Sequence, residues 1–562
     1  WHLEFPEVFE KGGFDCVLGN PPWEKLTIYE REFFVGKDDT IATTQKKSER
    51  EKLITGLRES NHQLYMLWIH ELRKFYKISL WFKESQYFTL SNTGELNTYP
   101  LFTELSRKIL NENGRVGIII KSALANTTTY KDLFSELLKK KNLVSFYDFK
   151  NWKFLFPNVG FHERFALLTL SGKSKPIQNH LFAYECVDVE DINDEKIYAL
   201  DFEMIKKFNP NTETCPVFLN EKDIQIAQKI YSKFDVIVNE NNNINKWGIS
   251  YVTQIHMSGG SHLFNNKEEL QKNGYKLNRN FYKKDNEIYL PLYEGKYIQN
   301  YDYRFASFEN IPADKRFSKK PATYTPTLGQ KQDVGYEIEP RYWIDEKKYI
   351  ELKQKCNLKY QFQFCCRLVT NVISNARTCI GCIMPTYPAN NLCLILNFKS
   401  KDVFEYSKKL VLFNAIFSSF VFDYVARQKV TANLLKSVLW QLPLPSLIYF
   451  DDMKINDISL KDYIIDRVIK LIACTSGTKY IALILGYKDA PYIWDKSERE
   501  RIRTELDVIM AYVYGISHND LSYILDTFPI VRKKDNQKYG EYRTKRLILE
   551  KYDELKDKFK NL

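Results

Sequence analysis

The sequence predicts an α/β fold in which a sheet flanked by helices is followed by an α+β region and a helical C-terminal region. Residues 1–170 alternate short apolar runs, typical of buried strands, with segments whose apolar residues keep helical spacing. This alternation stops at the polar segment 171–176, SGKSKP, and helical patterns dominate after residue 446. A chain of 562 residues is expected to form about two to four domains.

The first region opens with a short apolar strand at 14–18, FDCVL. Helical spacing follows over 53–75 and again over 101–109, where Asn113-Gly114 is the expected stop. Further buried strands are predicted at 115–120, 143–149 and 165–170. We therefore predict a first domain over 1–175, with its strands covered by helices.

Two further domains are predicted, over 215–445 and 446–562. The first consists of short mixed segments broken by polar stretches, which indicates an α+β domain. The clearest helix of the second starts at a predicted capping box, Ser497 with Glu500, and ends at Gly515.

Composition limits the classes of partner. The 82 basic and 70 acidic residues give a net charge of +12, which favours a polyanion such as nucleic acid, although codon bias explains the lysines equally well. Neither an apolar run of 18 residues nor a signal peptide is present, so we expect no membrane partner and a cytoplasmic protein. The ten cysteines do not form the two ligand pairs that zinc usually takes, so no metal is predicted.

The motif that carries chemistry is Asn20-Pro21-Pro22-Trp23, directly after the first strand. Ligands bind at the carboxyl ends of strands in α/β sheets. The Asn20 amide oxygen and the Pro21 carbonyl, held by consecutive prolines, would form a fixed pair of acceptors for an amino group. Trp23 offers a face on which a base could stack. The alternative is a simple strand exit in which Trp23 fills the core.

With its preceding strand, this motif resembles the catalytic motif of amino-methyltransferases that use S-adenosylmethionine. The similarity covers 14–24, FDCVLGNPPWE, then 96–102, LNTYPLF, and 114–119, GRVGII. The segments 291–296, 422–429 and 540–546 resemble the specificity region and tail of large restriction-modification methylases, including type IIG and phage-exclusion enzymes. Lys121 departs from the family, which often has proline there.

The resemblance implies a Rossmann-like methyltransferase sheet, a target-recognition domain over 215–445, and N6-adenine methylation of duplex DNA in a restriction-modification or phage-defence system. Asn20 and Pro21 would accept from the adenine amino group, Pro22 would hold the loop, and Trp23 would stack on the flipped base. Phe156, in the segment FLFP, would form a second wall, with core packing as an equal alternative. Protein-glutamine or RNA-base methylation, or a non-catalytic DNA-binding subunit, are the rival functions.

The cofactor loop is missing from the sequence pattern. No strand-Gly-x-Gly-helix segment precedes or follows the motif, so we expect that loop upstream of residue 1. The first strand should then show an open edge, and the residues around Trp23 and Tyr99 should be unusually exposed. A nuclease domain or subunit would lie upstream or in trans, because Glu294-Gly295-Lys296 with Asp285 is too short a pattern to indicate one.

Contacts to the DNA backbone are predicted at basic positions in three segments. Lys315 and Arg316 belong to a basic loop with Lys319, Lys320 and Lys331, for which solvation is the alternative. The other candidates are Arg427, Lys429, Arg532, Lys533, Lys534, Arg543, Lys545 and Arg546.

Overall fold

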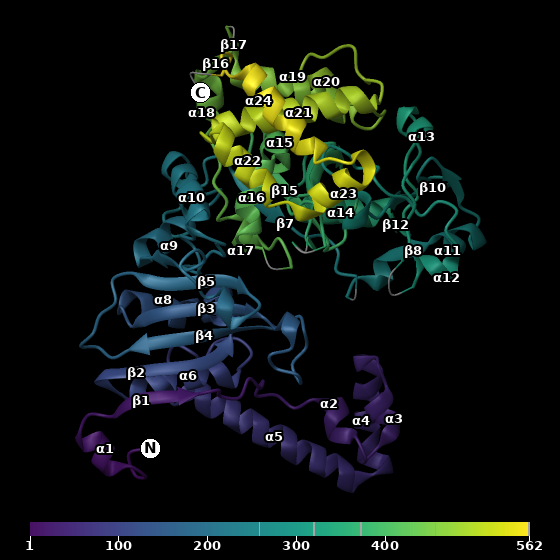
Figure 1. The fold of residues 1–562 in the computed structure, drawn as a ribbon. Coiled ribbons are helices and arrows are strands. Elements are labelled where there is room, and N and C mark those ends of the chain that lie inside the picture. The colour runs from purple at the N-terminus through teal and green to yellow at the C-terminus, as the bar shows by residue number, and fades with distance from the viewer. Residues whose placement is uncertain are drawn as a thin grey trace. The chain divides into compact units, whose positions relative to one another are not determined.

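The chain divides into two compact units, Trp1–Ile224 and Gln225–Leu562 (Figure 1). The computed structural model describes residues 1–257, 259–318, 321–370, 372, 374–430, 432–455 and 457–559.

The first unit is built on a six-stranded sheet of order β1-β2-β4-β3-β5-β6. β1 runs parallel to β2 and β3 runs parallel to β5, while β4 lies antiparallel between β2 and β3. The four predicted strands are confirmed. The strands are β1 (Phe14–Gly19), β2 (Leu110–Lys121), β3 (Leu143–Lys150), β4 (Arg164–Ser171), β5 (His180–Cys186) and β6 (Tyr198–Leu200).

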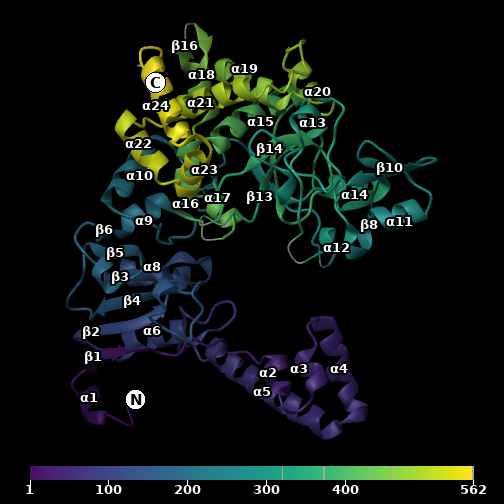
Figure 2. The ribbon, with the colours of Figure 1, turned by 45° about the vertical axis from the view of Figure 1, so that its right-hand side comes forward.

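Helices cover this sheet and extend from it. Phe134 of α8 faces Phe146 of β3 at a ring distance of 6.3 Å. In both views α5 leads from the sheet to a small helical cluster formed by α2, α3 and α4 (Figures 1 and 2). Phe34 and Trp68 are buried in that cluster. The helices are α1 (Pro6–Glu10), α2 (Glu30–Phe34), α3 (Asp39–Thr43), α4 (Lys47–Ser60), α5 (His62–Glu84), α6 (Thr98–Ile109), α7 (Ala123–Asn126), α8 (Lys131–Lys139) and α9 (Phe202–Phe208); α10 (Glu221–Lys233) crosses the boundary.

Three predicted boundaries in this unit were wrong. The helical spacing over 53–75 belongs to two helices, because the Asn61 side chain accepts from the Leu64 amide and starts α5. Asn113-Gly114 does not stop α6: β2 already begins at Leu110 and contains both residues. The domain does not end at residue 175, because β5 and β6 extend the sheet.

The second unit contains two larger antiparallel sheets, of order β8-β12-β11-β10-β9 and β14-β13-β15-β7, and a β16-β17 pair. Tyr293, Phe308 and Ile395 belong to one of its buried apolar clusters. The strands are β7 (Ile249–Val252), β8 (Phe264–Asn266), β9 (Lys276–Asn278), β10 (Phe281–Lys284), β11 (Glu287–Pro291), β12 (Tyr342–Asp345), β13 (Phe362–Arg367), β14 (Gly381–Pro385), β15 (Cys393–Phe398), β16 (Lys454–Ile455) and β17 (Ile458–Ser459).

The C-terminal region is helical, as predicted, but it does not form a unit of its own. α19 and α21 pack against α15, which lies before the predicted boundary at residue 446. The helices are α11 (Lys267–Lys272), α12 (Ala313–Arg316), α13 (Leu328–Gln332), α14 (Glu346–Lys355), α15 (Val403–Ser418), α16 (Phe420–Arg427), α17 (Lys436–Leu439), α18 (Leu447–Asp452), α19 (Leu460–Ile472), α20 (Lys479–Ile484), α21 (Lys496–Val513), α22 (His518–Asp526), α23 (Pro529–Tyr539) and α24 (Arg543–Leu555).

The predicted capping box of α21 was also wrong. Asp495 is the N-cap, and its carboxylate accepts from the Glu498 amide at 2.6 Å. The Ser497 hydroxyl donates to the same carboxylate. Asp is as good an N-cap as Ser. Because Asp495 precedes Ser497, the helix begins two residues earlier than predicted.

In the part of the chain that is described, no single helix has the length and apolar character needed to cross a membrane, and the bent pair α15–α16 meets that test only by length and composition.

Candidate active site

The loop Asn20–Trp23 leaves β1 at the carboxyl edge of the parallel pair β1–β2, where Gly19 lies opposite Ile118. β1 is the terminal strand of the sheet and Leu18 is 83% exposed, so the predicted open edge is confirmed. The expectation of exposure around Tyr99 was wrong. Tyr99 is buried and its ring packs edge-on against Tyr130 at 5.5 Å.

The second half of the loop is clamped to the start of α6. The Thr98 hydroxyl donates to the Pro22 carbonyl at 2.6 Å and accepts from the Glu24 amide at 2.9 Å. The Thr98 amide in turn donates to the Glu24 carbonyl at 2.9 Å. Thr98 therefore fixes the loop in a role that the sequence motif did not reveal, because its partners lie more than seventy residues away.

Trp23 is anchored to the sheet. Its indole Nε1 donates to the Ile119 carbonyl at 3.1 Å. Its ring lies 6.5 Å from the ring of Phe165, at 22°, and it packs against a buried cluster that includes Phe149. These contacts hold the half-buried ring in one orientation. Trp23 therefore packs against the core, as the alternative interpretation of the motif predicted.

Phe156 does not stand opposite Trp23 as a separate wall. The two rings meet edge to face at 5.6 Å, and Phe156 also touches Phe165 at 4.8 Å. Asn151 holds the Phe156 backbone: its amide donates to the Phe156 carbonyl and its oxygen accepts from the Phe156 amide, both at 3.0 Å. Trp23 and Phe156 therefore form one aromatic surface, with no space for a base between them.

Asn20 and Pro21 differ from the clamped part of the loop. Asn20 is exposed, and within the described residues nothing donates to its side chain or to the Pro21 carbonyl. Two acceptors at the carboxyl edge of the sheet are therefore open. The neighbouring Pro22 carbonyl, in contrast, accepts from the Thr98 hydroxyl. The loop thus has a fixed half and an available half.

The departure at Lys121 has a structural counterpart. Lys121 ends β2 and its ammonium lies 3.2 Å from the Glu163 carboxylate, just before β4. This ion pair connects the end of β2 to the end of the segment between β3 and β4, which contains Phe156. A proline could not make that contact.

The described residues do not form the glycine-rich turn that would bind the methyl donor implied by the resemblance. A nucleoside cofactor takes a glycine-rich turn that leads from a strand into a helix. Gly12 and Gly13 lie between α1 and β1, which is a helix-to-strand order. Gly259 and Gly260 lead into a short 3₁₀ turn, Ser261–Leu263.

The predicted DNA contacts divide into paired and unpaired cations. Arg543 binds Glu500, Lys545 binds Asp526 at 2.6 Å, and Arg546 binds both Glu541 and Glu550. These three residues are engaged within the protein, and the contacts with the DNA backbone that the sequence suggests for them stay predictions. Glu500 of α21 and Asp526 of α22 lie 43 and 19 positions from Arg543 and Lys545 in the sequence, whereas both partners of Arg546 lie within five positions of it.

Other predicted cations are also in use. Arg316 is buried and lies 3.1 Å from Glu268. The Arg427 guanidinium lies 4.7 Å from the centre of the Phe528 ring, and burial lowers its pKa. The Lys429 ammonium lies 5.1 Å from the Tyr231 ring. Lys331 binds Asp302 at 2.7 Å, and Lys319 and Lys320 lie outside the described residues.

Four predicted contacts remain open to solvent. Lys315 on α12 and Arg532, Lys533 and Lys534 on α23 are exposed, and none of their side chains has a partner in the described part of the chain. Glu294, considered for a nuclease, is buried and paired with Arg341. No group of three or more metal-binding side chains occurs among the described residues.

The comparison with protein families agrees with the resemblance read from the sequence. Residues 1–78, which include the Asn20 loop, match the family model of the Eco57I restriction-modification methylases. The recognition of a restriction-modification methylase is thus confirmed for this part of the chain. A search of curated proteins gave no significant match.

Solved structures of restriction-modification enzymes are similar to the chain at low identity. The type IIG restriction endonuclease BpuSI is 11% identical, with 75% of this chain and 50% of that chain covered and a TM-score of 0.26. The type IIL enzyme MmeI in complex with DNA is 11% identical, with coverages of 94% and 58% and a TM-score of 0.38. A nuclease-deletion mutant of the type ISP enzyme LlaGI, bound to a DNA substrate mimic, is 11% identical, with coverages of 88% and 43% and a TM-score of 0.37. The chain spans about half the length of these proteins.

Proposed function

We propose that this chain carries the base-binding side of a site-specific DNA methyltransferase, which transfers a methyl group from S-adenosylmethionine to N6 of an adenine flipped out of duplex DNA. The system would be one of restriction-modification or phage defence. The observation that carries the proposal is the division of the loop: Asn20 and Pro21 offer open acceptors, while Thr98 and Trp23 fix the residues beside them.

The chemistry explains why two neutral acceptors suit this reaction. The lone pair of an aromatic amino group is delocalised into the ring, so the nitrogen is a poor nucleophile. Hydrogen bonds from its two N–H groups to the Asn20 oxygen and the Pro21 carbonyl favour a pyramidal nitrogen, whose lone pair is free for the methyl group. Acceptors fixed before the reaction stabilise the transition state without rearranging. An amide, unlike a carboxylate, does not compete for the methyl group.

Trp23 provides the stacking surface of the proposed site. Its ring is held by the bond from Nε1 to Ile119 and is half-exposed, so a base can stack on its open face without ordering the ring first. Phe156 contributes by packing against the Trp23 ring in an edge-to-face pair.

The same acceptors would also hold a glutamine side chain or an RNA base, so the substrate class rests on the rest of the molecule. The exposed cations of α23 favour a polyanion over a peptide. A non-catalytic DNA-binding subunit, the third alternative, has no need of a clamp that leaves Asn20 and Pro21 open.

Labelled methyl transfer tests the proposal. The protein, expressed with the coding sequence that flanks this chain, is incubated with tritiated S-adenosylmethionine and with duplex DNA, RNA or cell protein. We expect label in duplex DNA, recovered as N6-methyladenine after digestion to nucleosides. Label in glutamine or in RNA would replace the proposal by one of its rivals. Absence of label in all three would favour the non-catalytic subunit.

A further inference from the structure

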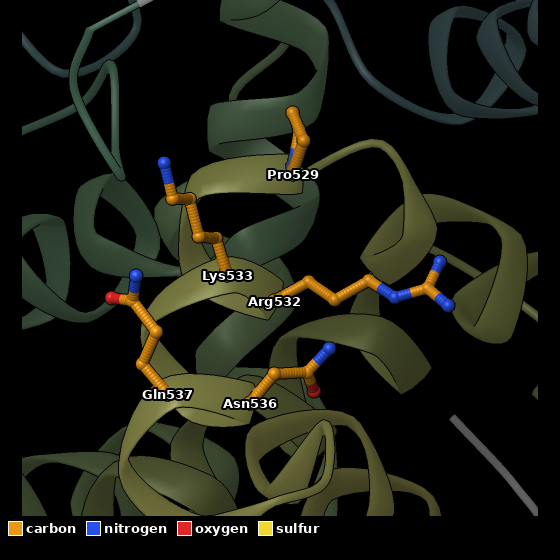
Figure 3. A pocket seen from close by; sticks show the side chains of 5 residues that line it. All are labelled: Pro529, Arg532, Lys533, Asn536 and Gln537. Carbon is orange, nitrogen blue, oxygen red and sulfur yellow. The ribbon is translucent and has the colours of Figure 1, made fainter.

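The exposed face of α23 carries side-chain amides as well as cations. Pro529, Arg532, Lys533, Asn536 and Gln537 line a shallow hollow on this helix. Figure 3 shows Lys533 and Gln537 along one flank and Arg532 and Asn536 along the other. Within the described residues none of these four side chains has a partner in the protein.

Other contacts hold the helix in place. Phe528, which precedes α23, is fully buried and packs edge-on against Phe420 at 4.9 Å. The Asp535 carboxylate accepts from the Thr544 amide at 2.6 Å. Arg543 lies 4.7 Å from the Tyr539 ring. α23 is therefore a fixed support for its exposed side chains, although none of its own residues is buried.

The exposed residues form two rows with the spacing of one helical turn. Arg532 and Asn536 are four residues apart, as are Lys533 and Gln537, so each pair lies side by side on the helix surface. Each row joins a cation to a side-chain amide. Cations alone suffice for phosphates, whereas an amide can donate and accept at the same time.

That combination matches the edges of base pairs. Arg and Lys pair with O6 and N7 of guanine, and Asn and Gln pair with N6 and N7 of adenine, in the major groove, which admits an α-helix. The neighbouring cations of α24 are neutralised by acidic partners, so the positive charge available for DNA on this part of the chain is concentrated on α23. Lys534 is exposed on the same helix and does not line the hollow, so it is the candidate for a phosphate contact beside the base-reading face.

We propose that α23 enters the major groove of duplex DNA and reads base edges with Arg532, Lys533, Asn536 and Gln537. This inference takes its partner, duplex DNA, from the proposed function, but it does not depend on methyl transfer. It adds a specificity-determining helix outside the predicted target-recognition domain, which ends at residue 445.

Selection from a random duplex library tests the proposal with the full chain. The parent protein should enrich a defined sequence. Asn536→Ala and Gln537→Ala should each lose preference at one position, by roughly tenfold to a hundredfold. Arg532→Lys keeps the charge but loses the two-pronged hydrogen bond, so it should lose a guanine preference with an unchanged salt dependence.

Lys534→Ala is the matched control on the same helix. It should weaken binding to all sequences alike and reduce the slope of log affinity against log salt by about 0.9, with the enriched sequence unchanged. An unchanged motif in all three face variants would overturn the proposal, as would a parent that enriches no sequence. Failure of the proposed function is a separate result, because it appears as missing N6-methyladenine with sequence selection intact.

Discussion

The Asn20 loop and the basic C-terminal segment share an arrangement, although they lie in different units. In the loop, Pro22 and Trp23 are bound to the protein, whereas Asn20 and Pro21 are open. In the C-terminal segment, Arg543, Lys545 and Arg546 on α24 are bound by acidic side chains, whereas the cations of α23 are open.

The comparison shows that a functional motif and a charge cluster contain residues of two kinds. Some of them are bound within the protein, and others are open to solvent. The sequence predicts the set as a whole, but only the partners found in the structure separate its members.

The largest change is expected at Trp23. Trp23→Ala removes both the ring packing and the hydrogen bond to Ile119, so the free energy of unfolding should fall by about 2–3 kcal/mol. Trp23→Phe keeps the packing and should cost about 1 kcal/mol. Denaturant titration measures both values. Trp152→Ala, at a ring that is 45% exposed and lies 4.2 Å from the Lys150 ammonium, is the control and should change stability by less than about 1 kcal/mol. An unchanged free energy of unfolding in Trp23→Ala would show that this ring does not anchor the loop to the sheet.

Thr98→Val should loosen the loop without touching the open acceptors. It removes the hydroxyl that binds the Pro22 carbonyl and the Glu24 amide, and we expect methyl transfer to fall by about tenfold, or about 1.4 kcal/mol. Thr93→Val is a matched control, because the Thr93 hydroxyl makes an equally short bond, 2.6 Å, to the Thr129 carbonyl. Equal effects of the two variants on methyl transfer would contradict the role of Thr98 in fixing the loop.

Much of the fold could be predicted from sequence because its signals are local. The strand before Asn20, the strands over 143–149 and 165–170, and the helical C-terminal region all follow from apolar spacing within a few residues. The position of the Asn20 loop at the carboxyl end of β1 was predictable for the same reason.

What could not be predicted depends on contacts between distant segments. The domain boundary at 175 was misplaced because a polar turn inside a sheet has the same composition as a linker. The role of Thr98 and the neutralisation of Arg543 by Glu500 join residues 76 and 43 positions apart. A basic run alone does not show which of its charges have partners.

Salt dependence should separate the two classes of cation. Lys534→Ala should lower the slope of log affinity for DNA against log salt by about 0.9, whereas Lys545→Ala should leave it nearly unchanged, because Asp526 already binds Lys545. Fluorescence anisotropy at several salt concentrations measures both slopes. A larger change for Lys545 would mean that its ion pair opens when DNA binds.

A pH-dependent effect is expected at the support beneath α23. Asp507 accepts from the Phe420 amide at 2.9 Å, and burial raises the pKa of its carboxyl to about 6. The folded protein then holds this proton more tightly than the unfolded chain, so the free energy of unfolding should fall as pH rises from about 4 to about 6. Asp507→Asn should remove that contribution and raise stability at pH 7 by about 1–2 kcal/mol. An identical pH profile in the variant would place the ionisation elsewhere.

The most direct test of the central claim compares stability and activity in Asn20→Ala. Asn20 is exposed and without a partner among the described residues, so its truncation should change the free energy of unfolding by less than about 0.5 kcal/mol. Methyl transfer to duplex DNA, measured with the protein expressed with its flanking coding sequence, should fall by about a hundredfold or more while DNA affinity is unchanged. Parent-like methyl transfer in Asn20→Ala would contradict the assignment of this loop as the acceptor site.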